Sequence, residues 1–125
     1  MTITEFLRAR LDDDEAKARA AHGATWVASR RGGVVDLDDA EGHEIAGRDG
    51  GLAWPDADFM AHHDPARVLR EVAAKRRLVD QWADRYDDNP HATSPEAADA
   101  ADVLHTLASV YSDHPDYQRQ WAPHQ

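Results

Sequence analysis

Apolar residues recur at helical spacing directly after three recognisable helix starts. At the N-terminus, Thr2 can cap a helix while Glu5, three positions later, reaches back to it, which is the pattern of a capping box. Apolar residues then repeat every three or four positions toward Gly23, a residue type that commonly ends helices. The pattern therefore predicts an N-terminal helix that stops shortly before Gly23.

Two further helices are predicted from a capping residue followed by proline. Asp64 precedes Pro65, and Ser94 precedes Pro95. In each pair a side-chain cap stands before a residue whose fixed φ suits the first helical position. An apolar stripe at helical spacing follows each start. The sequence predicts two antiparallel helices over Pro65–Tyr86 and Pro95–Tyr111.

The segment between the first two helices has the pattern of short strands. In "TWVASRRGGVVDLDD" two β-prone runs flank Arg-Arg-Gly-Gly, which favours a hairpin. The stretch "GHEIAG" can add a third strand after a turn in "DDAEG". We therefore expect a small antiparallel sheet from about Trp26 to Ala46, and an α+β fold for the whole chain.

The length of 125 residues is typical of one domain, so residues 1–125 are expected to form a single domain. A polar linker is expected at about 87–93, between the last two helices. Prolines punctuate the C-terminal tail, residues 112–125. We expect this tail to lie extended across the domain, with Tyr117 and Trp121 filling grooves on its surface.

One charge interrupts the apolar stripe of the second predicted helix. Arg76 lies four positions after Val72 and three before Val79, so we expect its side chain to be partly buried and paired with a carboxylate. The expected partner is Asp113 or an acidic residue of the first helix. Loss of a buried pair would cost on the order of 3 kcal/mol. Arg67 begins an i, i+4 ladder of charges on another face of the same helix.

Composition excludes several classes of function. The formal net charge of −10 argues against nucleic-acid binding, which needs a basic face. Without cysteine there is no disulfide, thiolate zinc site or thiol nucleophile. The N-terminus lacks the apolar core of a signal peptide, and no run approaches membrane-spanning length. We therefore expect a cytoplasmic protein that binds neither membranes nor nucleic acids; its oligomeric state stays open.

Two stretches together resemble the hallmark segments of a known family. They are "HDPARVLREVAAKRRLVD" and "YSDHPDYQRQWAP", and "FLRARLDDDE" and the tryptophan of "ATWVA" fit the same pattern. The chain is thereby identified as a member of a family of small uncharacterised proteins of actinomycetes and their phages (domain of unknown function 6221). The resemblance implies kinship without an activity. It also implies cysteine pairs in many members, suggestive of a zinc site, which this chain lacks.

Metal binding is an alternative that the histidines leave open. His63, Asp113 and His114 would supply two imidazoles and one carboxylate, which can form a facial triad of metal ligands if the tail returns to the start of the second helix. A zinc protein or a metal-dependent hydrolase using these residues is the resulting alternative. The simpler interpretation makes Asp64 a helix cap and the two histidines polar surface residues or tail anchors, with no cofactor.

The interpretation favoured by elimination is a non-enzymatic protein-binding or regulatory module. No serine has the context of a nucleophile elbow, and no carboxylate pair lies in a recognisable apolar pocket. Acidic clusters at 12–15, 36–41 and 84–88 would leave a negative surface for a basic protein partner. The residues expected to serve in binding or structure are Asp64, Arg67, Arg76, Asp113, His114, Tyr117 and Trp121.

Overall fold

The computed structural model describes residues 1–87 and 94–123. Their internal contacts divide the chain into two compact units. Met1–Asp13 and Val72–Gln125 form one, here called the helical unit, and Asp14–Glu71 form the other, the sheet unit. The elements, in order, are α1 (Ile3–Ala20), β1 (Trp26–Arg31), β2 (Val34–Asp39), β3 (Glu44–Ala46), α2 (Trp54–His62), α3 (Pro65–Asp87), α4 (Pro95–Ser109) and the 3₁₀ helix η1 (Arg119–Trp121).

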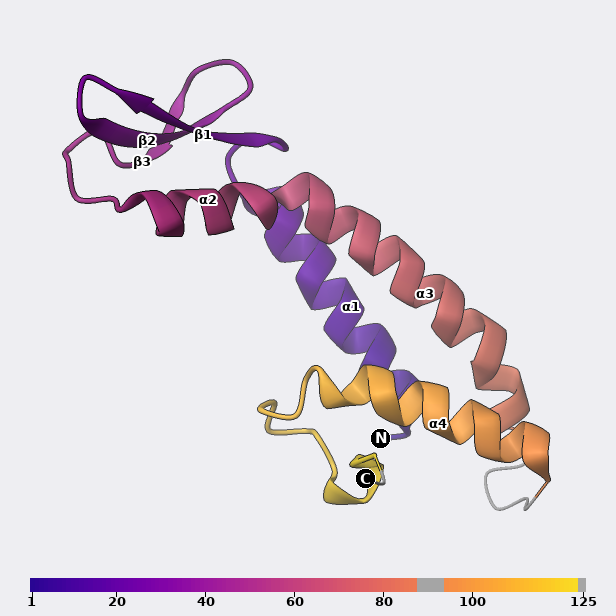
Figure 1. Ribbon diagram of the computed structural model, residues 1–125. Coiled ribbons are helices and arrows are strands. Elements are labelled where there is room, and N and C mark those ends of the chain that lie inside the picture. The colour runs from indigo at the N-terminus through magenta and orange to yellow at the C-terminus, as the bar shows by residue number, and fades with distance from the viewer. Residues whose placement is uncertain (88–93, 124–125) are drawn as a thin grey trace. The chain divides into compact units, whose positions relative to one another are not determined.

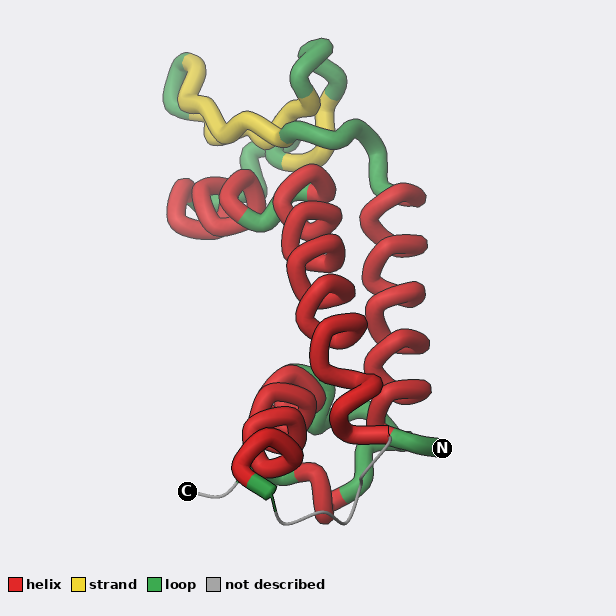
Figure 2. Tube along the Cα trace, turned by 90° about the vertical axis from the view of Figure 1, so that its right-hand side faces the viewer, coloured by secondary structure: helices red, strands yellow, loops and turns green. Residues whose placement is uncertain are grey.

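The sheet unit contains the predicted three-stranded antiparallel sheet, with β2 in the centre. The β1–β2 hairpin turns through Gly32 and Gly33, both with positive φ, as a tight two-residue hairpin turn requires. Leu37 of β2 is fully buried. Both views place α2 along one face of the sheet (Figure 1, Figure 2).

Helix α2 was not among the predicted elements. It begins at Trp54, carries a proline in its first turn and is nine residues long. Ala57 is its buried residue, and the Arg30 guanidinium lies 4.4 Å from the centre of the Trp54 ring. A helix that buries so small a side chain leaves almost no apolar stripe in the sequence. Its existence depends on packing against the sheet rather than on local pattern.

The helical unit holds most of the apolar core among the described residues. Arg8 pairs with Asp80 at 3.4 Å, and Asp12 pairs with Arg76 at 2.8 Å. A step of four residues forward along α1 thus matches a step of four backward along α3, so the two helices are antiparallel in this unit. The buried apolar side chains are Ile3, Phe6, Leu7, Leu11, Val72, Val79, Ala83, Ala97, Ala100, Leu104, Ala108 and Trp121.

The C-terminal tail packs around one aromatic ring of α1. The Phe6 ring is fully buried, and its centre lies 5.0 Å from that of Trp121 and 6.1 Å from that of Tyr117. Trp121 is 4% exposed and Tyr117 is half-buried, as the sequence predicted. The tail, yellow in Figure 1, contains successive turns and η1 rather than a uniformly extended strand, because the rings must converge on a single point.

The predicted α+β fold is confirmed, and the chain reverses between α3 and α4 (Figure 1). The bounds differ from prediction by only one or two residues at the ends of α3 and α4. The expected linker at 87–93 falls almost wholly outside the described residues, and the single-domain expectation stays a prediction.

Arg76 is partly buried and pairs with the first helix, as expected, but its partner lies at the surface. Its side chain is 33% exposed, and that of its partner Asp12 is 69% exposed. Surface ion pairs contribute little because water and salt screen them. We now expect Arg76→Ala to cost about 1 kcal/mol or less in urea unfolding. Exposed Arg77→Ala is the control, at roughly 0.5 kcal/mol or below; a loss near 3 kcal/mol for Arg76→Ala would contradict the surface assignment.

Candidate functional site

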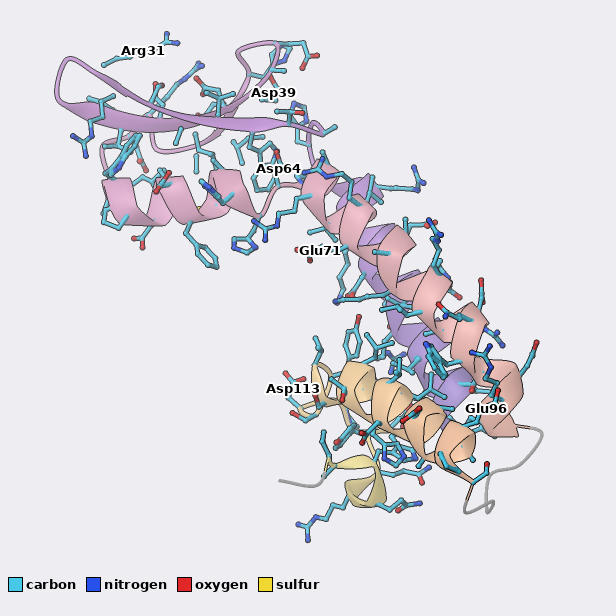
Figure 3. The ribbon with its side chains drawn as sticks, turned by 45° about the vertical axis from the view of Figure 1, so that its right-hand side comes forward. Arg31, Asp39, Asp64, Glu71, Glu96 and Asp113 are labelled. Atoms are coloured by element: carbon cyan, nitrogen blue, oxygen red, sulfur yellow. The ribbon has the colours of Figure 1, made fainter. Side chains whose placement is uncertain are left out.

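Asp64 lies at the junction of α2 and α3 in the sheet unit (Figure 3). Its side chain is 8% exposed. Its Oδ1 accepts the Arg67 backbone N–H at 3.0 Å and so caps α3, as predicted. Its Oδ2 accepts the Trp26 backbone N–H at 3.1 Å. One carboxylate therefore joins the start of α3 to the start of β1, a second role that the sequence did not indicate.

The neighbours of Asp64 make local contacts. Arg67 pairs with Glu71 at 3.0 Å and donates to the His62 carbonyl at 3.2 Å, which confirms the expected i, i+4 ladder at its first step. The His63 ring stacks on the exposed Phe59 ring, with centres 4.4 Å apart. These contacts hold the turn between α2 and α3.

The other residues of the predicted metal set belong to the helical unit. Asp113 is exposed. His114 lies against Arg10, whose Nη1 is 2.8 Å from its Nδ1, and the Asp116 backbone N–H donates to the same nitrogen at 3.0 Å. The His114 ring also meets Phe6 edge-on. His114 therefore serves as a tail anchor in this structure, and a set completed by His63 of the sheet unit stays a prediction.

A different histidine–carboxylate group assembles in the sheet unit. His22 follows α1, Asp39 ends β2 (Figure 3) and His43 follows the β2–β3 turn. Asp39 Oδ2 lies 3.4 Å from His22 Nε2 and 3.3 Å from His43 Nδ1. Among the described residues, this is the group of three whose ligand atoms all lie within 4.8 Å of one another. Sequence reasoning missed it, although the spacing of four between Asp39 and His43 was visible.

The charge state of Asp39 is set by its surroundings. Burial would raise the pKa of this carboxyl, but backbone N–H groups of His43 and Glu41 and the adjacent His43 ring outweigh burial. The pKa of Asp39 therefore lies below its usual 3.8, and the group is anionic at neutral pH.

The expected acidic surface is only partly present. Asp36, Asp38 and Asp39 are buried in the central strand, so Glu41 is the exposed acid of the cluster at 36–41. In the cluster at 12–15, arginines pair with Asp12, Asp13 and Glu15. Within 84–88, side chains are described only as far as residue 86. The sequence therefore predicts more unpaired negative charge at the surface than the structure has. Which strand lies buried in the centre of a sheet, and which charges pair, depends on tertiary structure.

An apolar groove in the helical unit is lined by residues of α3, α4 and the C-terminal tail and is here called the α4 groove. It has a volume of about 480 Å³. Its lining residues are Leu78, Asp102, Val103, Thr106, Leu107 and Pro123. Leu78 is 39% exposed, although it is a large apolar residue. The groove thus combines an open apolar floor with a single charged lining residue, an aspartate.

Comparison with known proteins identifies a family but no function. A model of a family of unknown function (DUF6221) matches residues 1–123. No curated protein and no solved structure matches the chain. No helix in the described part of the chain is long and apolar enough to cross a membrane.

Proposed function

The chain belongs to the DUF6221 family, and for this member we propose a protein-binding function in which the α4 groove receives a basic amphipathic segment of a partner. The observation that carries the proposal is the groove itself, apolar in its floor and acidic at its only charged lining position. Grooves of this kind bind an amphipathic helix through apolar anchors at helical spacing.

The floor supplies the apolar part of the recognition. Leu78 from α3 and Val103 and Leu107 from α4 form it, with Pro123 of the tail. Leu78 and Pro123 are exposed, and Val103 and Leu107 are partly exposed. Apolar side chains that share one groove differ from scattered surface residues, which need no explanation. Burying them against leucine or isoleucine side chains of a partner would supply the main favourable free energy.

Charge favours a basic partner. Helix α4 carries Glu96, Asp99 and Asp102 but no lysine or arginine. Arg85 pairs with Glu96 at 3.0 Å, at the first turn of α4 (Figure 3). No described residue forms an ion pair with Asp99 or Asp102. These two carboxylates stand one turn apart, where lysines beside the apolar stripe of a partner helix can reach them.

A synthetic peptide tests this proposal directly. The probe is a helix-forming peptide with leucines at i, i+3, i+4 and i+7 and lysines elsewhere; its counterpart carries glutamates in place of the lysines. We expect the lysine peptide alone to bind. Asp102→Lys should weaken its binding about tenfold at roughly 50 mM salt, measured by fluorescence anisotropy, and the difference should shrink near 500 mM.

Matched variants separate the groove from general charge and exposed apolar area. Asp56→Lys makes the same change in net charge at an exposed position of the sheet unit. Val110→Gln removes an apolar side chain that is 60% exposed but outside the groove lining. Leu78→Gln should weaken binding of the lysine peptide more than Val110→Gln does. Equal losses for Asp56→Lys and Asp102→Lys, or no saturable binding of the lysine peptide, would refute the proposed site.

A further inference from the structure

We propose that His22, Asp39 and His43 form a binding site for a divalent transition metal, with zinc the best-fitting ion. The ligand atoms would be His22 Nε2, Asp39 Oδ2 and His43 Nδ1. This site is independent of the α4 groove, since all three residues belong to the sheet unit.

Two of the three distances between ligand atoms already fit tetrahedral coordination, and the third pair, His22 Nε2 and His43 Nδ1, lies within 4.8 Å. Zinc binds imidazole nitrogen and carboxylate oxygen at about 2.0–2.1 Å, so neighbouring ligand atoms in a tetrahedral site stand roughly 3.3 Å apart. Asp39 Oδ2 lies 3.4 Å from His22 Nε2 and 3.3 Å from His43 Nδ1. The two rings stand at 85° to each other with their centres 6.0 Å apart. An ion could therefore bind with small side-chain rotations.

Asp39 is held in place by contacts that leave one oxygen for an ion. Its Oδ1 accepts backbone N–H groups from Glu41 at 3.0 Å and His43 at 2.8 Å. This leaves Oδ2 facing the two imidazoles. Contacts that fix a ligating carboxylate commonly set the affinity of a metal site. Its side chain is 4% exposed, so it is the rigid member of the group.

The backbone around His22 is shaped to approach Asp39. Gly23 has φ +75°, and a Cβ at this position would stand 2.6 Å from the Asp39 Cβ. Only glycine fits both the conformation and the space. The Trp26 indole N–H donates to the His22 carbonyl at 2.8 Å and holds the backbone of that residue. His22 is thereby positioned by backbone contacts that do not involve its imidazole.

The ligand types and their exposure select the class of ion. Two imidazoles with one carboxylate suit zinc, cobalt or nickel better than calcium or magnesium, which prefer oxygen ligands. Each imidazole is 70% exposed, so further coordination positions would face solvent and be filled by water. A bound ion would link the segment after α1 to the β2–β3 turn, as a clip within the sheet unit.

Metal titration of the full-length, untagged protein tests the site. We expect saturable one-to-one binding of zinc by calorimetry and a tetrahedral visible spectrum with cobalt. His22→Ala and His43→Ala should each weaken zinc binding by roughly 10- to 100-fold or more. Asp39→Asn should weaken it similarly, since the amide can keep the turn contacts at Oδ1 while it lacks the ligand charge.

His62→Ala is the matched control. His62 also lies four residues after an aspartate, Asp58, at 3.8 Å, and its side chain is likewise 70% exposed. It lacks the second imidazole, so its replacement should leave affinity unchanged. His22→Ala is the decisive variant because His22 lies outside the turn that Asp39 holds. No one-to-one binding, unchanged affinity in His22→Ala, or an equal loss in His62→Ala would overturn the site.

Discussion

Trp121→Ala is expected to lower the free energy of unfolding by about 3–5 kcal/mol, the typical cost of truncating a buried tryptophan. The side chain is 4% exposed, and its ring centre lies 5.0 Å from that of fully buried Phe6. Tyr117 meets the same indole edge-on, with centres 5.8 Å apart. The substitution would open a cavity beside Phe6 and remove the main contact that fastens the tail. Urea unfolding followed by circular dichroism measures the loss.

Val110→Ala is the control for this experiment. Val110 is 60% exposed and belongs to the same unit, so its truncation should cost roughly 0.5 kcal/mol or less. A Trp121→Ala protein as stable as Val110→Ala would mean that the tail contributes nothing to the helical unit. Limited proteolysis gives an independent measurement: the tail of the Trp121→Ala protein should be cleaved faster than that of the wild type.

The helix starts could be predicted from sequence because their causes are local. The Glu5 backbone N–H donates to the Thr2 hydroxyl at 3.1 Å, and the Ala97 N–H donates to the Ser94 hydroxyl at 3.2 Å. Each contact spans three residues, so the residues that form it stand together in the sequence. The β1–β2 hairpin was predictable for the same reason, since Gly32 and Gly33 determine its turn.

Features that depend on distant segments could not be predicted in this way. The run "VVDLDD" looks like a surface acidic cluster, yet it forms the central strand, where Asp38 is buried beside Arg48 at 3.3 Å. His22 and His43 come from connections separated by two strands, and only the β1–β2 pairing, which places Trp26 opposite Asp39, brings the segment after α1 near the second turn. The sequence contains these ligands but does not show that they meet.

Asp64→Ala is expected to cost roughly 2–3 kcal/mol, because two different hydrogen bonds are lost together. The cap on the Arg67 N–H accounts for about 1 kcal/mol. The Trp26 N–H, a part-buried donor, would be left without the carboxylate oxygen at 3.1 Å, which adds about 1–2 kcal/mol. Urea unfolding of the variant measures the sum.

Two further substitutions at Asp64 separate its roles. Serine can cap α3 but is too short to reach Trp26 as well, so Asp64→Ser should recover about half of the loss. Asparagine has one carbonyl oxygen for two N–H donors. The free energy of unfolding of Asp64→Asn should therefore also lie between those of the wild type and Asp64→Ala. Asp56→Ala, in the first turn of α2, is the control and should cost only a few tenths of a kcal/mol. If the Asp64→Ser protein were no more stable than the Asp64→Ala protein, capping of α3 would not be a stabilising role of Asp64. If alanine cost no more than the Asp56 control, the carboxylate would not hold the junction of β1 and α3.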